Sequence, residues 1–210
     1  MNCNKKIAFL GYGDLAKQIY THIGCCGNNI VIFDSTFSSS NLEVFPFDSY
    51  LNYSQQFNWV VSIGYKHLAK KTNIIKSLLK LDSTLYSFIH PTSYISPNAD
   101  IHPGAILYPM CNIDLNVTIS PGVLLNNSVT VSHDSTIGIG TYISPGVTIS
   151  GNVILGEGCF IGSGSIISNN ITIGNNVVIG PGTVVTQNIP DNCHVIGNPM
   201  RTLDKHLNLI

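Results

Sequence analysis

The sequence predicts two structural units of different class. Residues 1–90 are expected to form an α/β domain with a short, Rossmann-like parallel sheet, and residues 91–210 an all-β parallel helix of hexapeptide repeats that ends in a C-terminal tail. Two observations lead to this prediction. Strand-like and helix-like segments alternate up to about residue 88, and an aliphatic residue then occupies every sixth position from Ile95 to Val185, sixteen positions out of sixteen.

The first unit shows a β-α-β-β-α-β order. Buried apolar runs that end at glycine or polar residues indicate strands, and longer runs with helical spacing indicate helices. The order is typical of a short parallel sheet with flanking helices. The expected strands are 5–13, 29–35, 59–65 and 83–90, and the expected helices are 14–23 and 66–81.

The second unit repeats every six residues, a period that fits neither an amphipathic helix nor an alternating strand. A small or β-branched residue stands two positions before each aliphatic one, at least as far as Cys159. Both kinds of side chain are therefore expected to point into a narrow interior, which makes Cys111 and Cys159 small core residues. Glycine, asparagine and proline fill the positions between, as corners require.

Composition excludes several classes of partner. The net charge is −1 and only 10% of the 210 residues are charged, so neither nucleic acid nor an anionic membrane is an expected partner. Mean hydropathy is +0.24, but no apolar run reaches eighteen residues. The N-terminal apolar run breaks at Gly11, too early for a signal peptide, so we expect a cytoplasmic protein with six free thiols.

His133 is the only histidine between His102 and His194, and Asp134 follows it directly. It stands two residues after the inward-pointing Val131, which places it at a corner of the coil. A lone histidine at a corner is usually just solvated. An imidazole that titrates near neutral pH can also remove a proton from an amine or hydroxyl, so both interpretations stand at this point.

Four motifs carry a resemblance that covers nearly the whole chain: "IAFLGYGDLAK", "FIHPTSYISPNADI", "LLNNSVTVSHDSTIG" and "VIGPGTVVTQNIPDNCHVIGNPMRTL". They resemble the nucleotide-sugar acetyltransferases of the left-handed β-helix (hexapeptide-repeat) acyltransferase superfamily, in the branch of bacillosamine-type N-acetyltransferases and sialic acid O-acetyltransferases. The resemblance implies coils of eighteen residues, a homotrimer, a nucleotide-linked amino sugar as substrate and acetyl-CoA as acetyl donor.

The resemblance implies a catalytic role for the corner histidine. His133 would be the general base, and Asp134 would stabilise the imidazolium that forms. Gly151 lies one coil beyond His133, where an open backbone N–H would polarise the thioester carbonyl, although a glycine needed for the turn explains it almost as well. No cysteine stands at this corner, which favours direct transfer over an acyl-enzyme.

In the resembled family the pantetheine arm of the coenzyme lies in a groove between two subunits. That placement implies coenzyme contacts at Tyr142, Gly151, Ser163 and Pro181, and a substrate contact at Asn126. Tyr142 departs from the family, in which this position is often a coenzyme-contacting histidine. Metal-dependent relatives need three histidines, and the repeats hold only His102 and His133 internally, so no metal is expected.

The N-terminal unit begins with half of a dinucleotide fingerprint, Gly11-Tyr12-Gly13 after a strand and before a helix. Alone it would favour NAD, but the sheet lacks a second mononucleotide half. The resemblance instead assigns this unit to the nucleotide end of a sugar donor. Plain turn and cap chemistry explains most of these positions equally well. The candidate contacts are Gly13, Asp14, Leu15, Asp34, Ser35, Gly64 and His67.

Asp14 is a second departure, because relatives often have Gly-Gly-His where this chain has Gly13-Asp14-Leu15. A carboxylate at a helix N-terminus repels a phosphate, and Asp14 also fits a helix cap.

The sequence therefore predicts an acetyl-CoA-dependent N-acetyltransferase that acts on the amino group of a UDP- or TDP-linked amino-deoxysugar. One alternative is an O-acetyltransferase on a sialic-acid-like sugar that uses the same site. Another, from a different class, is a non-catalytic trimeric protein that binds sugar nucleotides.

Overall fold

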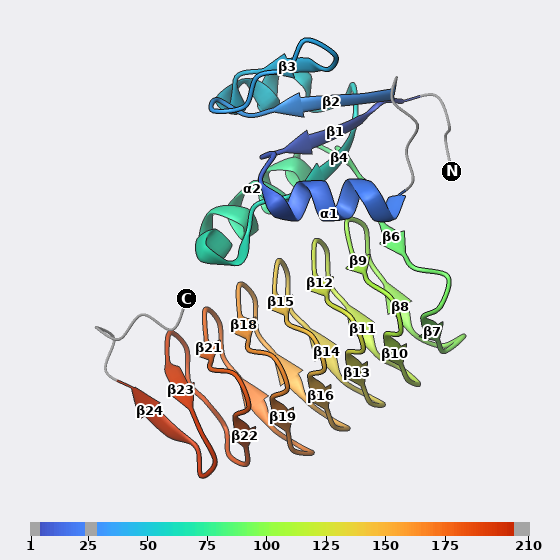
Figure 1. The fold of residues 1–210 in the computed structure, drawn as a ribbon. Helices are drawn as coiled ribbons and strands as arrows, with labels where there is room; N and C mark the ends of the chain where they lie inside the picture. Colours follow the sequence, from blue (N-terminus) through green and yellow to red (C-terminus); the bar gives the residue numbers. More distant parts are fainter. Residues whose placement is uncertain (1–4, 24–28, 204–210) are drawn as a thin grey trace.

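The computed structural model describes residues 5–23 and 29–203, and it confirms the predicted fold class: a small α/β domain followed by a left-handed hexapeptide β-helix. The α/β domain lies against one face of the β-helix (Figure 1). Helix α1 packs between one face of the domain sheet and the coils, and helix α2 packs on the opposite face of that sheet. No helix within the described ranges is long and apolar enough to cross a membrane.

The sheet of the α/β domain is parallel throughout, in the order β3-β2-β1-β4-β5. The chain first builds outward from β1 through β2 to β3 and then continues with β4 on the other side of β1. In sheets of this kind the point of reversal opens a crevice at the carboxyl ends of the strands. The elements are β1 (Ile7–Leu10), α1 (Asp14–Ile23), β2 (Ile30–Phe33), β3 (Glu43–Phe45), the 3₁₀ helix η2 (Phe47–Tyr53), β4 (Asn58–Val61), the 3₁₀ turn η3 (Tyr65–His67), α2 (Leu68–Lys80) and β5 (Thr84–Leu85).

Two details of this domain differ from the predicted element order. Strand β3 is additional: it is an edge strand of only three residues, at most half-buried, and Pro46 follows it directly. The predicted strand at 83–90 is two strands. β5 completes the domain sheet, whereas β6 (Phe88–Ile89) pairs with β9 (Ile106–Leu107) of the β-helix.

The β-helix consists of three sheets in which, before the last coil, every strand has two residues and the strands are parallel, and a residue pairs with the one eighteen positions along the chain, as Thr130 does with Thr148. The first sheet contains β7 (Tyr94–Ile95), β10 (Asn112–Ile113), β13 (Thr130–Val131), β16 (Thr148–Ile149), β19 (Ile166–Ile167) and β22 (Val184–Val185). The second contains β8 (Asp100–Ile101), β11 (Thr118–Ile119), β14 (Thr136–Ile137), β17 (Ile154–Leu155) and β20 (Thr172–Ile173).

The third sheet carries the α/β domain, and we call it the domain-facing sheet. It contains β6, β9, β12 (Leu124–Leu125), β15 (Tyr142–Ile143), β18 (Phe160–Ile161), β21 (Val178–Ile179), β23 (His194–Ile196) and β24 (Arg201–Leu203). The last coil is shorter, since Val178 pairs with His194, and β24 pairs antiparallel with β23 to end the stack.

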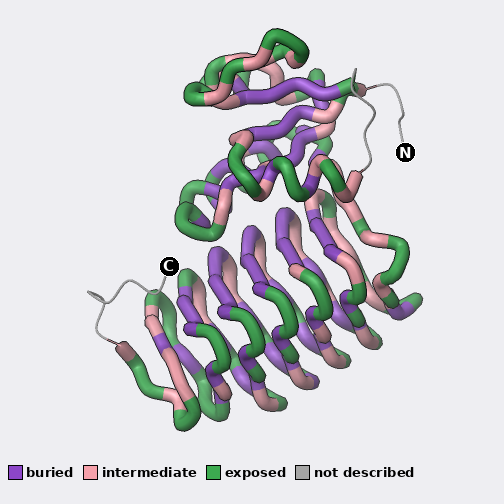
Figure 2. Tube along the Cα trace, viewed as in Figure 1, coloured by how far each residue is buried: buried purple, intermediate pink, exposed green. Residues whose placement is uncertain are grey.

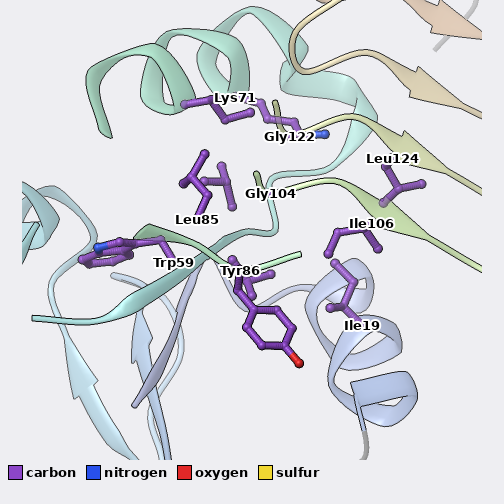
Figure 3. A pocket seen from close by; sticks show the side chains of 12 residues that line it. Ile19, Trp59, Lys71, Leu85, Tyr86, Gly104, Ile106, Gly122 and Leu124 are labelled. Carbon is purple, nitrogen blue, oxygen red and sulfur yellow. The ribbon is translucent and has the colours of Figure 1, made fainter. Parts of the chain in front are cut away.

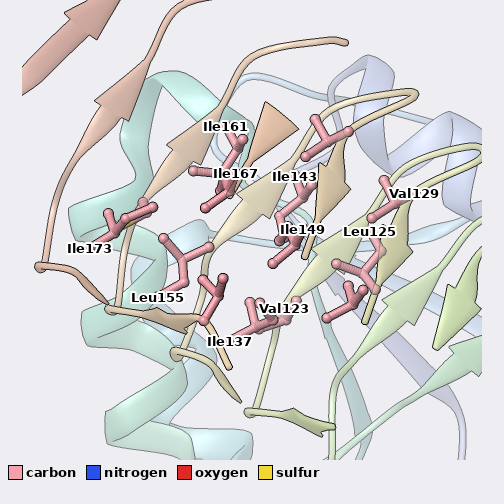
Figure 4. Close-up of a cluster of buried hydrophobic side chains, with 14 of the residues drawn as sticks. Val123, Leu125, Val129, Ile137, Ile143, Ile149, Leu155, Ile161, Ile167 and Ile173 are labelled. Atoms are coloured by element: carbon pink, nitrogen blue, oxygen red, sulfur yellow. The ribbon is translucent and has the colours of Figure 1, made fainter. Parts of the chain in front are cut away.

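The interior of the β-helix contains both side chains that the six-residue pattern places there. The aliphatic positions from Ile113 to Val185 and the small positions before them are almost fully buried (Figure 4). Cys111 and Cys159 lie in this core, where burial raises the pKa of their thiols to about 11 and about 12. Cys193 is a free thiol as well, and the predicted free thiols Cys3, Cys25 and Cys26 lie outside the described residues.

The outward positions show which face the α/β domain covers. On the domain-facing sheet, from β9 to β21, these side chains are apolar or aromatic and buried, at most 9% exposed (Figure 2). On the other two sheets the outward positions include exposed threonines such as Thr136 and Thr148 and the exposed apolar residues Ile154 and Ile166. The buried outward residues are Ile106, Leu124, Tyr142, Phe160 and Val178.

Helix α2 packs on one edge of the β-helix because that edge is made of glycines. Gly104, Gly122, Gly140 and Gly158 stand eighteen residues apart with φ between +63° and +80°, a region that side chains with a Cβ disfavour. A Cβ on Gly122 would lie 2.2 Å from Cδ1 of the buried Ile75 in α2. Lys76 of α2 also forms an ion pair with Glu157 of the same edge, 2.6 Å between Nζ and Oε1.

A small apolar cavity of about 10 Å³ remains under α2, between the domain and the coils (Figure 3). Lys71 points toward Gly122 in this region and is only 2% exposed, and burial lowers its pKa to about 7. A cavity of this size has room for roughly one water molecule and is a packing gap rather than a ligand site.

Replacing Gly122 by alanine is expected to destabilise the docking of α2. The alanine must adopt positive φ, which costs about 1–2 kcal/mol, and its Cβ also overlaps Ile75, which adds about 1–3 kcal/mol. Gly146→Ala is the matched control, because Gly146 has φ +68° and no atom within 4 Å of its hypothetical Cβ. Chemical denaturation measures both, and equal losses of stability would contradict the account of the glycine edge.

Candidate active site

The corner after β13 holds His133 and Asp134. Asp134 has φ 58°, and the same corner of the neighbouring coils has Asn116, Asn152 and Asn170 with φ between 56° and 61°. Asparagine and aspartate both tolerate this left-handed conformation. Turn geometry therefore accounts for an Asx residue at 134, and what distinguishes this corner is the negative charge beside a histidine.

The two side chains are in direct contact. Nδ1 of His133 lies 2.8 Å from Oδ2 of Asp134, and Asn116 donates from Nδ2 to the other carboxylate oxygen at 2.9 Å. The bond from Asn116, and after it the bond to His133, hold the pKa of Asp134 below its usual range. An ionised carboxylate accepts the proton of Nδ1, so Nε2 carries the lone pair. The imidazole is half-exposed, which makes Nε2 a proton acceptor that a ligand can reach.

Gly151 borders the imidazole. A Cβ at this position would lie 2.6 Å from both Nε2 and Cε1 of His133, so only glycine leaves the ring in place. The expectation that its backbone N–H is open is wrong in this structure, because that N–H donates to Oδ1 of Asn169 at 2.9 Å. The visible role of Gly151 is the space it leaves for the histidine.

A cavity of about 320 Å³ opens at the carboxyl ends of β1 and β4, where the strand order of the α/β domain reverses. It brings together six of the predicted binding residues, five from the α/β domain and one from the β-helix. Crevices at such reversal points are where open α/β sheets bind ligands. The lining residues are Gly13, Asp14, Leu15, Gln18, Ser62, Gly64, Tyr65, Lys66, His67 and Tyr142.

Two glycines of this crevice are not explained by the fold. Gly13 and Gly64 lie outside the positive-φ region, and a Cβ on either would meet no atom within 4 Å. Gly11 differs, because its φ of +87° requires glycine. The absent side chains of Gly13 and Gly64 instead leave the backbone open to close approach by a ligand.

The charges around the crevice are mixed. Lys66 and His67 line one wall, and Asp14 lies on the other. The Asp14 carboxylate is almost fully exposed and lies 3.5 Å from the ammonium of Lys17. The negative charge at the start of α1 is thus partly balanced by a neighbouring cation, and the opposite wall suits an anion.

Asp34 and Ser35 are not among the residues that line the crevice. The Asp34 carboxylate accepts hydrogen bonds from the backbone of Tyr12, Thr36 and Phe37, at 2.7–3.1 Å. Partial burial acts to raise the pKa of Asp34, but these bonds outweigh it and the pKa is lowered. Ser35 accepts a bond from the N–H of Phe47. Both side chains therefore hold the turn after β2.

The remaining predicted contacts lie on different edges of the β-helix. Ser163 and Pro181 are exposed and stacked at the corner after the domain-facing sheet, whereas Gly151 lies at the corner after the first sheet with His133. Asn126 is at the first of these corners and donates from Nδ2 to the hydroxyl of Tyr142 at 3.1 Å. One copy of the chain does not bring the histidine corner and the crevice together.

The sequence reasoning missed several residues of the site. In the crevice these are Gln18, Ser62, Tyr65 and Lys66, and the chain gave a signal for the last two, since Tyr65 ends the third predicted strand and Lys66 follows it. At the histidine corner Asn116 and Asn169 were missed as partners of Asp134 and Gly151, although each lies one eighteen-residue step away. The described ranges contain no group of three or more His, Cys, Asp or Glu residues that could hold a metal ion.

Comparisons with known proteins agree with this architecture. The bacterial transferase hexapeptide (six repeats) family matches residues 152–187. No curated protein matches the chain. The acetyltransferase domain of PglB from Neisseria gonorrhoeae is 30% identical over 95% of this chain and 100% of its own length, with a TM-score of 0.83. That domain is also known in complex with acetyl coenzyme A.

Two more distant structures share the fold. PerB from Caulobacter crescentus, in complex with CoA and GDP-perosamine, is 23% identical over 96% of this chain and 99% of its own, with a TM-score of 0.84. WeeI from Acinetobacter baumannii is 18% identical over 95% of this chain and 100% of its own, with a TM-score of 0.70.

Asp34→Asn is expected to cost about 1–2 kcal/mol of stability at pH 7, because one of two acceptor oxygens becomes a donor. The folded-state pKa of Asp34 is lowered, so its contribution is complete above the unfolded value of about 4 and disappears as the pH falls through the lower folded value. Chemical denaturation at pH values from 7 to 2 should show the free energies of unfolding of wild type and variant converging as the pH falls. Asp48→Asn is the control, since the exposed Asp48 side chain accepts no hydrogen bond within the described residues; a constant difference for Asp34→Asn would contradict this account.

Proposed function

The chain belongs to the hexapeptide-repeat acyltransferases with a left-handed β-helix, and we propose that it is an acetyl-CoA-dependent N-acetyltransferase acting on a nucleotide-linked amino-deoxysugar. The observation that carries the proposal is the histidine corner, where ionised Asp134 holds Nδ1 and leaves Nε2 free. The nucleotide crevice on the same chain supports it, as does the complex of the PglB domain with acetyl coenzyme A. A cytoplasmic location, where acetyl-CoA is available, is part of the same proposal.

In this mechanism the neutral amine of the sugar attacks the thioester carbonyl of acetyl-CoA. Nε2 of His133 removes a proton from the nitrogen as the N–C bond forms, and Asp134 stabilises the resulting imidazolium. The tetrahedral intermediate collapses with cleavage of the C–S bond, and the imidazolium returns the proton to the departing thiolate. The products are the N-acetylated sugar and free CoA. The thiols of Cys111 and Cys159 are buried in the coil core, which is consistent with direct transfer.

The nucleotide would occupy the crevice of the α/β domain. Gly13 and Gly64 let the nucleotide come close to the backbone, and Lys66 offers a positive charge to a diphosphate. His67, which also lines the cavity, offers ring nitrogens for hydrogen bonds. We keep UDP and TDP as the candidate carriers. The sugar then extends past Tyr142 to Asn126 on the β-helix.

We also propose that the protein acts as a homotrimer. The crevice and the histidine corner lie on different edges of one β-helix, so a second copy is needed to bring Nε2 of His133 to the sugar. The exposed stack of Ser163 and Pro181 then lines the groove for the coenzyme together with Gly151 of a neighbouring copy. The exposed apolar residues Ile154 and Ile166 on the two uncovered sheets suit burial between copies.

His133→Asn is expected to lower kcat about 100-fold or more with little change in KM, because general-base catalysis contributes on that scale. Thiol release from acetyl-CoA measures it, with UDP- and TDP-linked amino sugars and free sialic acid as acceptors. His102→Asn is the matched control, since His102 forms a second His–Asp contact on the β-helix, 3.0 Å to Asp100 through Nε2. Its activity should be unchanged.

The outcomes of this assay separate the alternatives. Turnover of sialic acid alone would favour the O-acetyltransferase. Tight binding of nucleotide sugars without turnover would favour the non-catalytic binding protein. Full activity of His133→Asn would contradict the mechanism.

Alanine at Gly13 or Gly64 is expected to weaken binding of the nucleotide about tenfold without loss of stability. The added Cβ meets open space in the free protein but fills the path of the ligand. Calorimetric titration with UDP and TDP measures affinity, and thermal unfolding measures stability. Gly146→Ala is the control and should show the opposite result, a lower stability and an unchanged affinity for the nucleotide. Unaltered affinity in both crevice variants would contradict the assignment of this pocket.

A further inference from the structure

Asn126 is held in one orientation by its neighbours. The backbone N–H of Asn127 donates to Oδ1 of Asn126 at 2.8 Å, so the carbonyl end of the amide faces its own chain. The amino end donates to the hydroxyl of Tyr142 at 3.1 Å. Only one hydrogen of Nδ2 remains, and it has no acceptor among the described residues. The amide therefore offers a donor, not an acceptor, to a ligand.

Tyr142 is itself fixed by aromatic packing. Its ring is 9% exposed and stacks on Phe160 with centroids 5.8 Å apart and an interplanar angle of 20°. Tyr65 of η3 packs against both rings, at 5.6 Å from Tyr142 and 5.2 Å from Phe160. The ring thus has little freedom to move, and its hydroxyl marks a defined point where the crevice meets the β-helix.

The hydroxyl of Tyr142 keeps its proton at neutral pH. Burial raises its pKa above the usual value, the nearby Tyr65 acts in the same direction, and the bond from Asn126 acts against them. The oxygen accepts the bond from Asn126, and its own proton has no acceptor within the described part of the chain. Two hydrogen-bond donors, one from each side chain, are therefore available next to each other.

We propose that Tyr142 is a positioning residue for the acceptor sugar: its hydroxyl fixes the amide of Asn126 so that both groups donate to an oxygen of the sugar. This inference rests on the proposed function and goes beyond it, because it assigns Tyr142 to the sugar rather than to the coenzyme. It also names the feature recognised, a hydrogen-bond acceptor on the sugar between the nucleotide and the reacting amine.

Tyr142→Phe tests the proposal, since it removes the hydroxyl and retains the ring. The KM for the nucleotide-linked amino sugar should rise about five- to tenfold, the scale of a lost neutral hydrogen bond, while kcat and the KM for acetyl-CoA stay within about twofold. Asn126→Ala should raise the same KM, and the effect of the double variant should be smaller than the sum of the two single effects, because the two side chains contact each other and share one sugar oxygen.

Tyr108→Phe is the matched control. Tyr108 lies one coil before Asn126, and its buried hydroxyl has no hydrogen-bond partner among the described residues, so its loss should leave all kinetic constants unchanged. Any of three results would overturn this inference alone. They are a rise in the KM for acetyl-CoA in Tyr142→Phe, additive effects in the double variant, and wild-type kinetic constants in Tyr142→Phe. Absence of turnover by the wild-type chain would overturn the proposed function and this inference with it.

Discussion

The structure depends on one constraint, the closure of each coil after eighteen residues. A strand of two residues cannot persist alone, and it is stabilised here by pairing with the coils before and after it and by the aliphatic column inside. Because the period is fixed, every outward position forms a column along the β-helix. One residue of a column can therefore differ from the others without disturbing the stack, as Asp134 does among the asparagines of its corner.

The residues that form these columns differ between the edges and faces of the β-helix. The edge under α2 is made of glycines, which let Ile75 and Thr72 approach the backbone closely. The edge after the first sheet has asparagines at its left-handed position, with Asp134 as the charged exception beside His133. On the domain-facing sheet the outward residues are apolar or aromatic instead of polar. They pack against the α/β domain, and one of them, Tyr142, lines the crevice of that domain.

Much of this was predictable because the pattern is periodic. The six-residue spacing is enough to predict the coils, the burial of the core cysteines and the corner position of His133. What the sequence did not reveal depends on contacts between distant segments. Asp34 looked like a ligand contact, but its hydrogen bonds to Tyr12 and Thr36 form only in the folded turn. Strand β3 has only three residues, too few for a pattern to mark it. The bond from Gly151 to Asn169 can be predicted only if it is known which side chain lies one coil away.

We propose that the coil register places His133 on one edge of the β-helix and the crevice for the nucleotide on another, so that two copies of the chain complete each site. A crystal structure with CoA and a nucleotide-linked amino sugar bound tests this directly. We expect the nucleotide between Gly13 and Gly64 of one copy, and the sugar amine within hydrogen-bonding distance of Nε2 of His133 of a neighbouring copy. An amine bound far from any His133, or a complete site within a single copy, would contradict the account.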